Sequence, residues 1–323
     1  MPRNAESCAC VSRSRSSRSL PSGSWSPILL PSATRPCAIR QWSPRGRGCR
    51  LRVPGDDAIT TADRTLARRE HHRRGDMAVE HRADDWNEYR MEYQNPHAVL
   101  EPLEREISVV DGILTTLCDE GVLDHTAYDH AKMLAHRQAV RDRFDMPWTA
   151  ITPRMQRTLY AISAIAQPRN MIAAGVFCGN TFISNAGAGV GPGASYAAEN
   201  LIGVEIRPEE AERAECNVRT IDPTGVARVV AADAIDVVSD FDGTIDLLYL
   251  DADGDAGRGK GIYLEILEAC LDKLSPGAVV LAHNSENQAE RLASYLAFVR
   301  DPANFRGSVN IVVDIEGLEA SRR

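Results

Sequence analysis

The sequence predicts a doubly wound α/β fold, with a mostly parallel sheet and a helical segment ahead of it. Beyond residue 168, five short apolar runs bounded by turn residues alternate with helical stretches, which is typical of a parallel sheet covered on both faces. Between residues 95 and 150 the apolar residues instead recur every three or four positions, which is the spacing of amphipathic helices. Three of the five runs end in an acidic residue, which indicates a ligand site along one edge of the sheet.

Residues 1–76 differ from the rest of the chain. They are rich in Ser, Arg and Pro and show neither a helical nor a strand period, so we expect a disordered tail. This stretch holds 15 of the chain's 37 Lys+Arg residues and 6 of its 45 Asp+Glu residues, so its net charge is +9. The remainder of the chain has a net charge of −17. A targeting peptide, a nucleic-acid-binding arm and an over-long translated start are the three interpretations. We favour the last, with Met77 as the native first residue.

The composition excludes several classes of protein. An acidic body argues against a nucleic-acid partner, and the longest apolar runs are too short to cross a membrane. The eight cysteines include no CxxC pair, which makes a zinc or redox motif unexpected and favours a reducing compartment. We therefore expect a cytoplasmic protein that acts on a small molecule.

Residues 84–150 are predicted to form a helical segment that covers the substrate. An apolar stripe runs from Leu100 to Leu117, with Gly121 as the stop signal. A second helix is predicted from an N-cap at Asp124 to about Arg143. The stripe needs a partner surface, either its own domain or a second copy in a homodimer, and packing on its own domain is the simpler expectation.

Residues 151–323 are predicted to form the sheet domain. Thr152 and the proline after it mark the start of its first helix. The strand runs are residues 171–177, 201–206, 227–234, 245–253 and 277–284, and the helical stretches are 207–220, 261–274 and a shorter one after Thr181.

A glycine loop follows the first strand run. Gly175 and Gly179 would let the backbone turn sharply and approach a ligand closely. The loop lacks the GxGxxG pattern of dinucleotide sites and the GxxxxGK[ST] pattern of phosphate-binding loops. A ligand with adenosine but no pyrophosphate fits better, and S-adenosylmethionine is the leading candidate.

Acidic residues end three successive strand runs, at Glu205, Asp233 and Asp251. An acid at the end of the second strand is suited to ribose hydroxyls, and one at the end of the third can reach an adenine amino group. Any one of them alone could simply cap a loop. Their recurrence along the same sheet edge favours a binding site.

The motifs together resemble a known enzyme family. From Thr152 to Arg323 the chain resembles class I O-methyltransferases of the caffeoyl-CoA/catechol type, through GVFCGNT, IGVEI, AADA, IDLLYLDAD, LSPGAVVLAHN and the closing DIEGLEASRR. The resemblance implies a seven-stranded Rossmann-like sheet that binds S-adenosylmethionine. The cofactor residues implied by it and by the strand ends are Gly175, Phe177, Gly179, Asn180, Thr181, Glu205, Ile206, Asp233, Ala234 and Asp251.

The resemblance also implies a divalent metal, Mg²⁺ or Mn²⁺, that binds the acceptor hydroxyls. Carried over to this chain, its ligands are Asp251, His283 and Asn284. His283 stands where the family has Asp, and it could instead be the general base of a metal-free reaction. Gly254 stands where the family has Lys. Lys260 follows six positions later. It could swing back into the site, but a solvated loop lysine is the favoured interpretation. The catalytic candidates are Asp251, His283 and Lys260.

We therefore predict a methyltransferase that acts on an oxygen of a small-molecule acceptor, with or without a metal. Two alternatives stay open: a metal-dependent glycosyltransferase that uses Asp251 and Asp253 as a DxD motif, and a methyltransferase-like protein that binds without turnover. Four aromatic residues are candidates to line an acceptor pocket, namely Trp86, Tyr89, Tyr93 and Trp148.

Overall fold

The computed structural model describes residues 79–255 and 257–323, so the predicted tail, residues 1–76, lies outside the described residues. The strands are β1 (Val79–Arg82), β2 (Asn170–Ala174), β3 (Asn200–Glu205), β4 (Ala227–Ala231), β5 (Ile245–Leu250), β6 (Leu274–His283), β7 (Gly307–Val312) and β8 (Leu318–Arg322). The α-helices are α2 (Leu103–Asp119), α3 (His130–Arg143), α4 (Pro153–Ala166), α5 (Asn180–Ala186), α6 (Pro208–Ile221), α7 (Ala234–Asp240), α8 (Ile262–Ala269) and α9 (Ala293–Val299).

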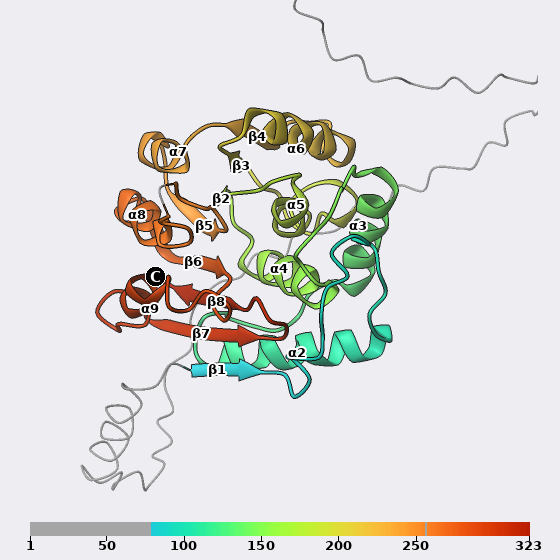
Figure 1. Ribbon diagram of the computed structural model, residues 1–323, viewed down its shortest axis with the longest axis horizontal. Coiled ribbons are helices and arrows are strands. Elements are labelled where there is room, and N and C mark those ends of the chain that lie inside the picture. Colours follow the sequence, from blue (N-terminus) through green and yellow to red (C-terminus); the bar gives the residue numbers. More distant parts are fainter. Residues whose placement is uncertain (1–78, 256) are drawn as a thin grey trace, which may run out of the picture. The chain divides into compact units, whose positions relative to one another are not determined.

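The described strands form one sheet in the order β1-β7-β8-β6-β5-β2-β3-β4 (Figure 1). Every neighbouring pair is parallel except the two that involve β8, which runs antiparallel to both β6 and β7. The predicted doubly wound, mostly parallel α/β fold is therefore confirmed. Among the described residues, every helix is too short or too polar to cross a bilayer.

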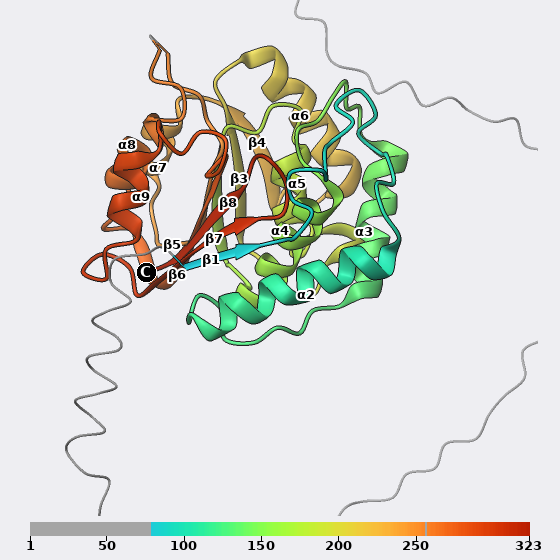
Figure 2. The same ribbon diagram turned by 60° about the horizontal axis from the view of Figure 1, so that its bottom comes forward.

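Helices cover both faces of the sheet. Helices α7, α8 and α9 lie on one face and α4, α5 and α6 on the other, an arrangement visible in Figure 1 and in the turned view of Figure 2. The side chains of β5 alternate between two apolar clusters: Leu247 and Tyr249 belong to one, Leu248 and Leu250 to the other. Because both faces of β5 are buried, its sequence from Leu247 to Leu250 is a continuous apolar run and does not alternate between apolar and polar residues.

The sheet has one strand more than the seven that were expected. β1 pairs in parallel with β7, in a register that runs from Val79 opposite Val309 to Arg82 opposite Val312. Its four residues alternate between half-buried and exposed. Such a short alternating segment carries too weak a pattern to be recognised from sequence.

The apolar stripe of α2 is buried against the chain's own domain. Val110, Ile113, Leu114 and Leu117 are fully buried and share an apolar cluster with residues of α4 and β7. Figure 2 shows α2 lying along β1 and β7. Residues 84–150 and the sheet therefore share one core.

The predicted start of the second helix was wrong. Helix α3 begins at His130, and the side chain of Asp129 caps it by accepting a hydrogen bond from the Lys132 backbone N–H at 3.0 Å. Asp124 instead pairs with both terminal nitrogens of Arg322 at 2.8 Å. Both acids are plausible caps by local pattern, and a contact with the far end of the chain decides between them.

Thr152 connects the first helix of the sheet domain to the loop after β7. Its buried hydroxyl accepts from the Met155 backbone N–H at 3.2 Å and donates to Asp314 Oδ2 at 2.7 Å. This bears out the predicted N-cap of α4 and adds a long-range hydrogen bond that the sequence does not reveal.

We predict that Thr152→Ala lowers the free energy of unfolding by about 1–2 kcal/mol, because it removes an N-cap and leaves a buried carboxylate short of a donor. Chemical denaturation measures the change. Thr115→Ala is the matched control: that hydroxyl is exposed and bonds only to its own helix, so its effect should stay within about 0.5 kcal/mol. Equal stability of the two variants would contradict the role assigned to Thr152.

Candidate functional site

The larger of two described cavities has a volume of about 750 Å³ and lies at the carboxyl ends of the parallel strands. Residues that follow β2, β3, β4, β5 and β6 line it. Strand β2 pairs with β3 on one side and β5 on the other, so the chain winds away from this point in both directions. Open α/β sheets bind their ligands at such a switch point.

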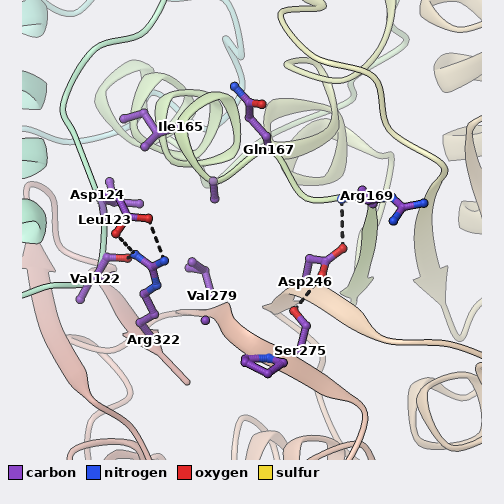
Figure 3. Close-up of a pocket in the computed structure, with 13 residues that line it drawn as sticks. Val122, Leu123, Asp124, Ile165, Gln167, Arg169, Asp246, Ser275, Val279 and Arg322 are labelled. Atoms are coloured by element: carbon purple, nitrogen blue, oxygen red, sulfur yellow. Dashed lines mark hydrogen bonds and ion pairs between the residues drawn. The ribbon is translucent and has the colours of Figure 1, made fainter. Parts of the chain in front are cut away.

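The second cavity, of about 280 Å³, lies near the amino ends of β2, β5 and β6 (Figure 3). The two acids that line it already have partners within the protein. Asp124 pairs with Arg322, and Asp246 accepts from the Arg169 backbone N–H at 3.0 Å and the Ser275 hydroxyl at 2.7 Å. Because these groups are paired with protein and not directed at an open space, we interpret this cavity as a structural crevice.

The predicted site residues converge on the larger cavity. Those that line it are Gly175, Phe177, Asn180, Thr181, Glu205, Ile206, Asp233, Ala234, Asp251, Lys260, His283 and Asn284. Gly179 is the exception: it precedes the first residue of α5 and lies against Ala214 of α6. It therefore shapes the loop from behind.

Gly175 allows two loops to meet at the switch point. Its φ is +79°, and a Cβ at this position would come within 2.5 Å of the Ala252 backbone nitrogen. Just before it, the Ala174 carbonyl accepts from the Asp251 backbone N–H at 2.8 Å. A side chain at residue 175 would separate the glycine loop from the acidic loop after β5.

Glu205 fixes the turn that follows β2. Its buried carboxylate accepts from the Phe177 backbone N–H at 2.8 Å and from Arg207 Nε at 3.1 Å. Phe177 has a φ of +48°, which is unusual for a non-glycine residue. The Trp148 ring lies against the Phe177 ring with centroids 4.8 Å apart. Glu205 thus orders the loop as well as facing the cavity.

Asp233 has a capping role in addition to its place in the cavity. It is the N-cap of α7, and its side chain accepts from the Ile235 backbone N–H at 2.8 Å. It also lines the cavity, beside Ala234. Ile206 lines the same cavity and is 60% exposed, so it offers an apolar surface to a ligand.

Lys260 is not a solvated loop lysine. It is only 8% exposed, and its Nζ lies 2.8 Å from Asp251 Oδ1. The loop between them doubles back, because Gly254 and Gly259 pair across it through backbone hydrogen bonds of 2.9 and 3.3 Å. The interpretation of Lys260 as a surface residue is therefore corrected.

His283 approaches the same carboxylate from the end of β6. Its Nδ1 lies 3.4 Å from Asp251 Oδ1, and neither ring nitrogen has a hydrogen-bond partner among the described residues. Burial disfavours the charged imidazolium, but Asp251 outweighs burial and raises the pKa of His283. Burial likewise favours a neutral Asp251, but Lys260 and His283 outweigh it and lower the pKa of Asp251.

A pair of buried acids behind the site escaped prediction. Asp314 and Glu316 lie in the loop between β7 and β8 and are both at most 4% exposed. Burial, followed by the charge of Asp314, raises the pKa of Glu316, which accepts a hydrogen bond from the Tyr93 hydroxyl at 3.0 Å. Applying the strand-end rule to the closing DIEGL segment would have identified both acids.

The four candidate aromatic residues do not form one pocket. Trp148 lines the cavity. Trp86 instead packs beneath Arg82, and the buried Tyr89 packs beneath Arg154. The Tyr93 hydroxyl donates a hydrogen bond to Glu316. The acceptor pocket predicted from all four is therefore reduced to Trp148.

The predicted metal site already holds a protein cation at its Asp251 end. Asp251 Oδ1 is already in contact with the Lys260 ammonium. Asn284 donates from Nδ2 to Asn287 Oδ1 at 3.1 Å, a bond that does not involve Oδ1 of Asn284, the atom that a metal would bind. Across residues 79–255 and 257–323, no three His, Cys, Asp or Glu side chains are grouped so that they could hold a metal ion.

Comparison with known proteins agrees with the fold. Residues 172–285 match the family model described as a methyltransferase domain. These residues are therefore similar to a methyltransferase domain. The match agrees with the methyltransferase family predicted from the motifs, and it runs from within β2 to just beyond β6, the strands whose ends line the large cavity. None of the curated proteins matches the sequence.

Solved structures resemble the methyltransferase domain at low sequence identity. An O-methyltransferase from Bacillus cereus with SAH is 15% identical and aligns over 67% of this chain and 99% of its own, with a TM-score of 0.44. Methyltransferase PaMTH1 from Podospora anserina, bound to SAH, is 14% identical and aligns over 70% of this chain and 98% of its own, with a TM-score of 0.46. TomG from Streptomyces achromogenes, an O-methyltransferase of tomaymycin synthesis in complex with SAM, is 19% identical. It aligns over 69% of this chain and 98% of its own, with a TM-score of 0.44. At these values the likeness decides nothing about this chain's chemistry.

We predict that Glu205→Ala weakens S-adenosylmethionine binding about 10- to 100-fold, because a charged acceptor of hydrogen bonds contributes about 1.5–3 kcal/mol. Isothermal titration calorimetry measures the change. Glu209→Ala, in the exposed first turn of α6, is the control and should leave the affinity unchanged. An unaltered affinity in Glu205→Ala would show that the cofactor does not contact the end of β3.

Proposed function

We propose that this domain transfers a methyl group from S-adenosylmethionine to an oxygen of a small-molecule acceptor, without a metal ion. The observation that carries the proposal is the meeting of Asp251, Lys260 and His283 at one end of a cavity whose other end is formed by the glycine loop and Glu205. The cavity volume of about 750 Å³ lies in the range of ligand pockets in proteins.

The cofactor is assigned to the side of the cavity formed by β2, β3 and β4. The loop from Gly175 to Thr181 would surround the methionine part. Glu205 would accept hydrogen bonds from the ribose hydroxyls. Its present partner Arg207 has a side chain that is 52% exposed, so it can move aside. Ile206, Asp233 and Ala234 would flank the adenine.

The acceptor is assigned to the remaining side, between Trp148 and the Asp251 loop. A hydroxyl oxygen there attacks the methyl carbon in line with the departing sulfur. The new O–C bond forms as the C–S bond breaks, and the electron pair of that bond stays on sulfur to give S-adenosylhomocysteine. The hydroxyl proton passes to the imidazole of His283 in its neutral form. Because Asp251 raises the pKa of His283, this form becomes more populated as the pH rises. Correct alignment of the reactants can supply about 7–11 kcal/mol of the barrier reduction.

The glycosyltransferase alternative requires a free pair of carboxylates to hold a metal and a diphosphate. Lys260 Nζ lies 2.8 Å from Asp251 and 3.5 Å from Asp253, so its ammonium already neutralises this pair. The family match to a methyltransferase domain also argues against it. The alternative of binding without turnover is decided by experiment.

The test is transfer of a labelled methyl group to a panel of phenols, catechols and hydroxy acids, with cofactor binding measured in parallel. We expect transfer to at least one oxygen acceptor. In Asp251→Asn we expect turnover to fall by about 100-fold or more, the scale of lost acid–base and positioning groups, while the cofactor still binds. Asp240→Asn is the control, because Asp240 is exposed at the end of α7 and does not line the cavity, so turnover should stay unchanged.

Tight cofactor binding with no transfer to any acceptor would favour a protein that binds without turnover. Transfer confined to nitrogen or carbon acceptors would overturn the assignment to oxygen.

A further inference from the structure

We infer that the side-chain ammonium of Lys260 replaces the divalent cation expected beside Asp251, and that it binds the acceptor oxygen directly. The inference rests on the proposed function and names the group that makes the reaction independent of metal. Lys260 is then a catalytic residue, since it contacts the reacting oxygen.

The ammonium occupies a cation site built from oxygen atoms. Lys260 Nζ lies 2.8 Å from Asp251 Oδ1, 2.9 Å from the Asp251 main-chain carbonyl oxygen and 3.5 Å from Asp253 Oδ2. Carboxylate and carbonyl oxygens are the donors that hard metal cations prefer. Here the same donor types surround a lysine nitrogen.

The loop between Asp251 and Lys260 is shaped to deliver this nitrogen. Gly254 and Gly259 form a short antiparallel bridge, and Gly259 has a φ of +50°. The turn brings Lys260 back to Asp251. Its Nζ also lies 5.7 Å from the centre of the buried Tyr263 ring. A solvated lysine would have none of these contacts.

A divalent ion at Asp251 would have to displace this ammonium or lie against it. Like charges a few ångströms apart repel strongly where water is scarce. The other two expected ligands, His283 and Asn284, bring no negative charge that would offset this repulsion. The site therefore carries its positive charge on the protein.

The ammonium can serve the acceptor as a metal would. It has three N–H donors; two are directed at oxygens of Asp251, and the third is free to turn from Asp253 to the cavity, which Lys260 lines. Donated to the acceptor oxygen, it stabilises the negative charge that develops as the hydroxyl proton leaves. The bonds made and broken are those of the transfer described above.

Two measurements on the full chain test the inference. The first is methyl transfer in EDTA compared with added Mg²⁺ or Mn²⁺: we expect wild-type rates within about twofold of one another. Lys260→Met should lose about 100-fold or more in turnover, the scale of a lost oxyanion donor, with cofactor affinity retained. Lys132→Met, on the far helix α3, removes one lysine charge as a control and should keep full turnover.

The second is Mn²⁺ binding by electron paramagnetic resonance, which does not require an acceptor. We define Asp251-dependent binding as Mn²⁺ binding that is lost when Asp251→Asn is added. Wild type and Lys132→Met should show none, whereas Lys260→Ala should show it. Activity lost in EDTA and restored by a divalent ion, or Mn²⁺ bound to wild type through Asp251, would overturn the inference. If no acceptor is ever methylated, the proposed function fails, but the Mn²⁺ result still decides whether Lys260 excludes the metal.

Discussion

The ion pair between Lys260 and Asp251 is the contact on which the site depends. Asp251, Asp253 and Asp255 follow β5 within five residues, and carboxylates so close together need positive partners. Lys260 neutralises the first two and Arg258 pairs with the third. Two unit charges 4 Å apart interact by about 4 kcal/mol at an effective dielectric constant of 20, and removing one member of a buried pair leaves the other uncompensated. The pair thus orders the loop and sets the charge of the cavity.

The sheet supplies the framework in which this pair becomes useful. Because β2 lies between β3 and β5, the loops after those strands open in a common crevice. Gly175 lets the glycine loop touch the backbone at Ala252, which brings the cofactor side and the acceptor side together. Glu205 reaches back to hold the Phe177 backbone N–H. The two halves of the site are therefore coupled through backbone contacts.

The parts of this arrangement that could be predicted from sequence are those with a local cause. Continuous apolar runs identified β2 to β6, and Thr152 with its proline identified the start of α4. The acids at strand ends identified the edge that holds the cavity. The burial of Lys260 depends on the loop closing between Gly254 and Gly259, and the choice of Asp129 over Asp124 depends on Arg322, 198 residues away from Asp124. Such long-range pairings leave no local pattern.

The most direct test of a protein-borne cation is a crystal structure grown with S-adenosylhomocysteine and millimolar Mn²⁺, with anomalous data collected near the manganese edge. The account predicts Lys260 Nζ in contact with Asp251 and no anomalous peak at coordination distance from that carboxylate. An anomalous peak bound to Asp251 and His283, with the Lys260 side chain displaced toward solvent, would contradict it.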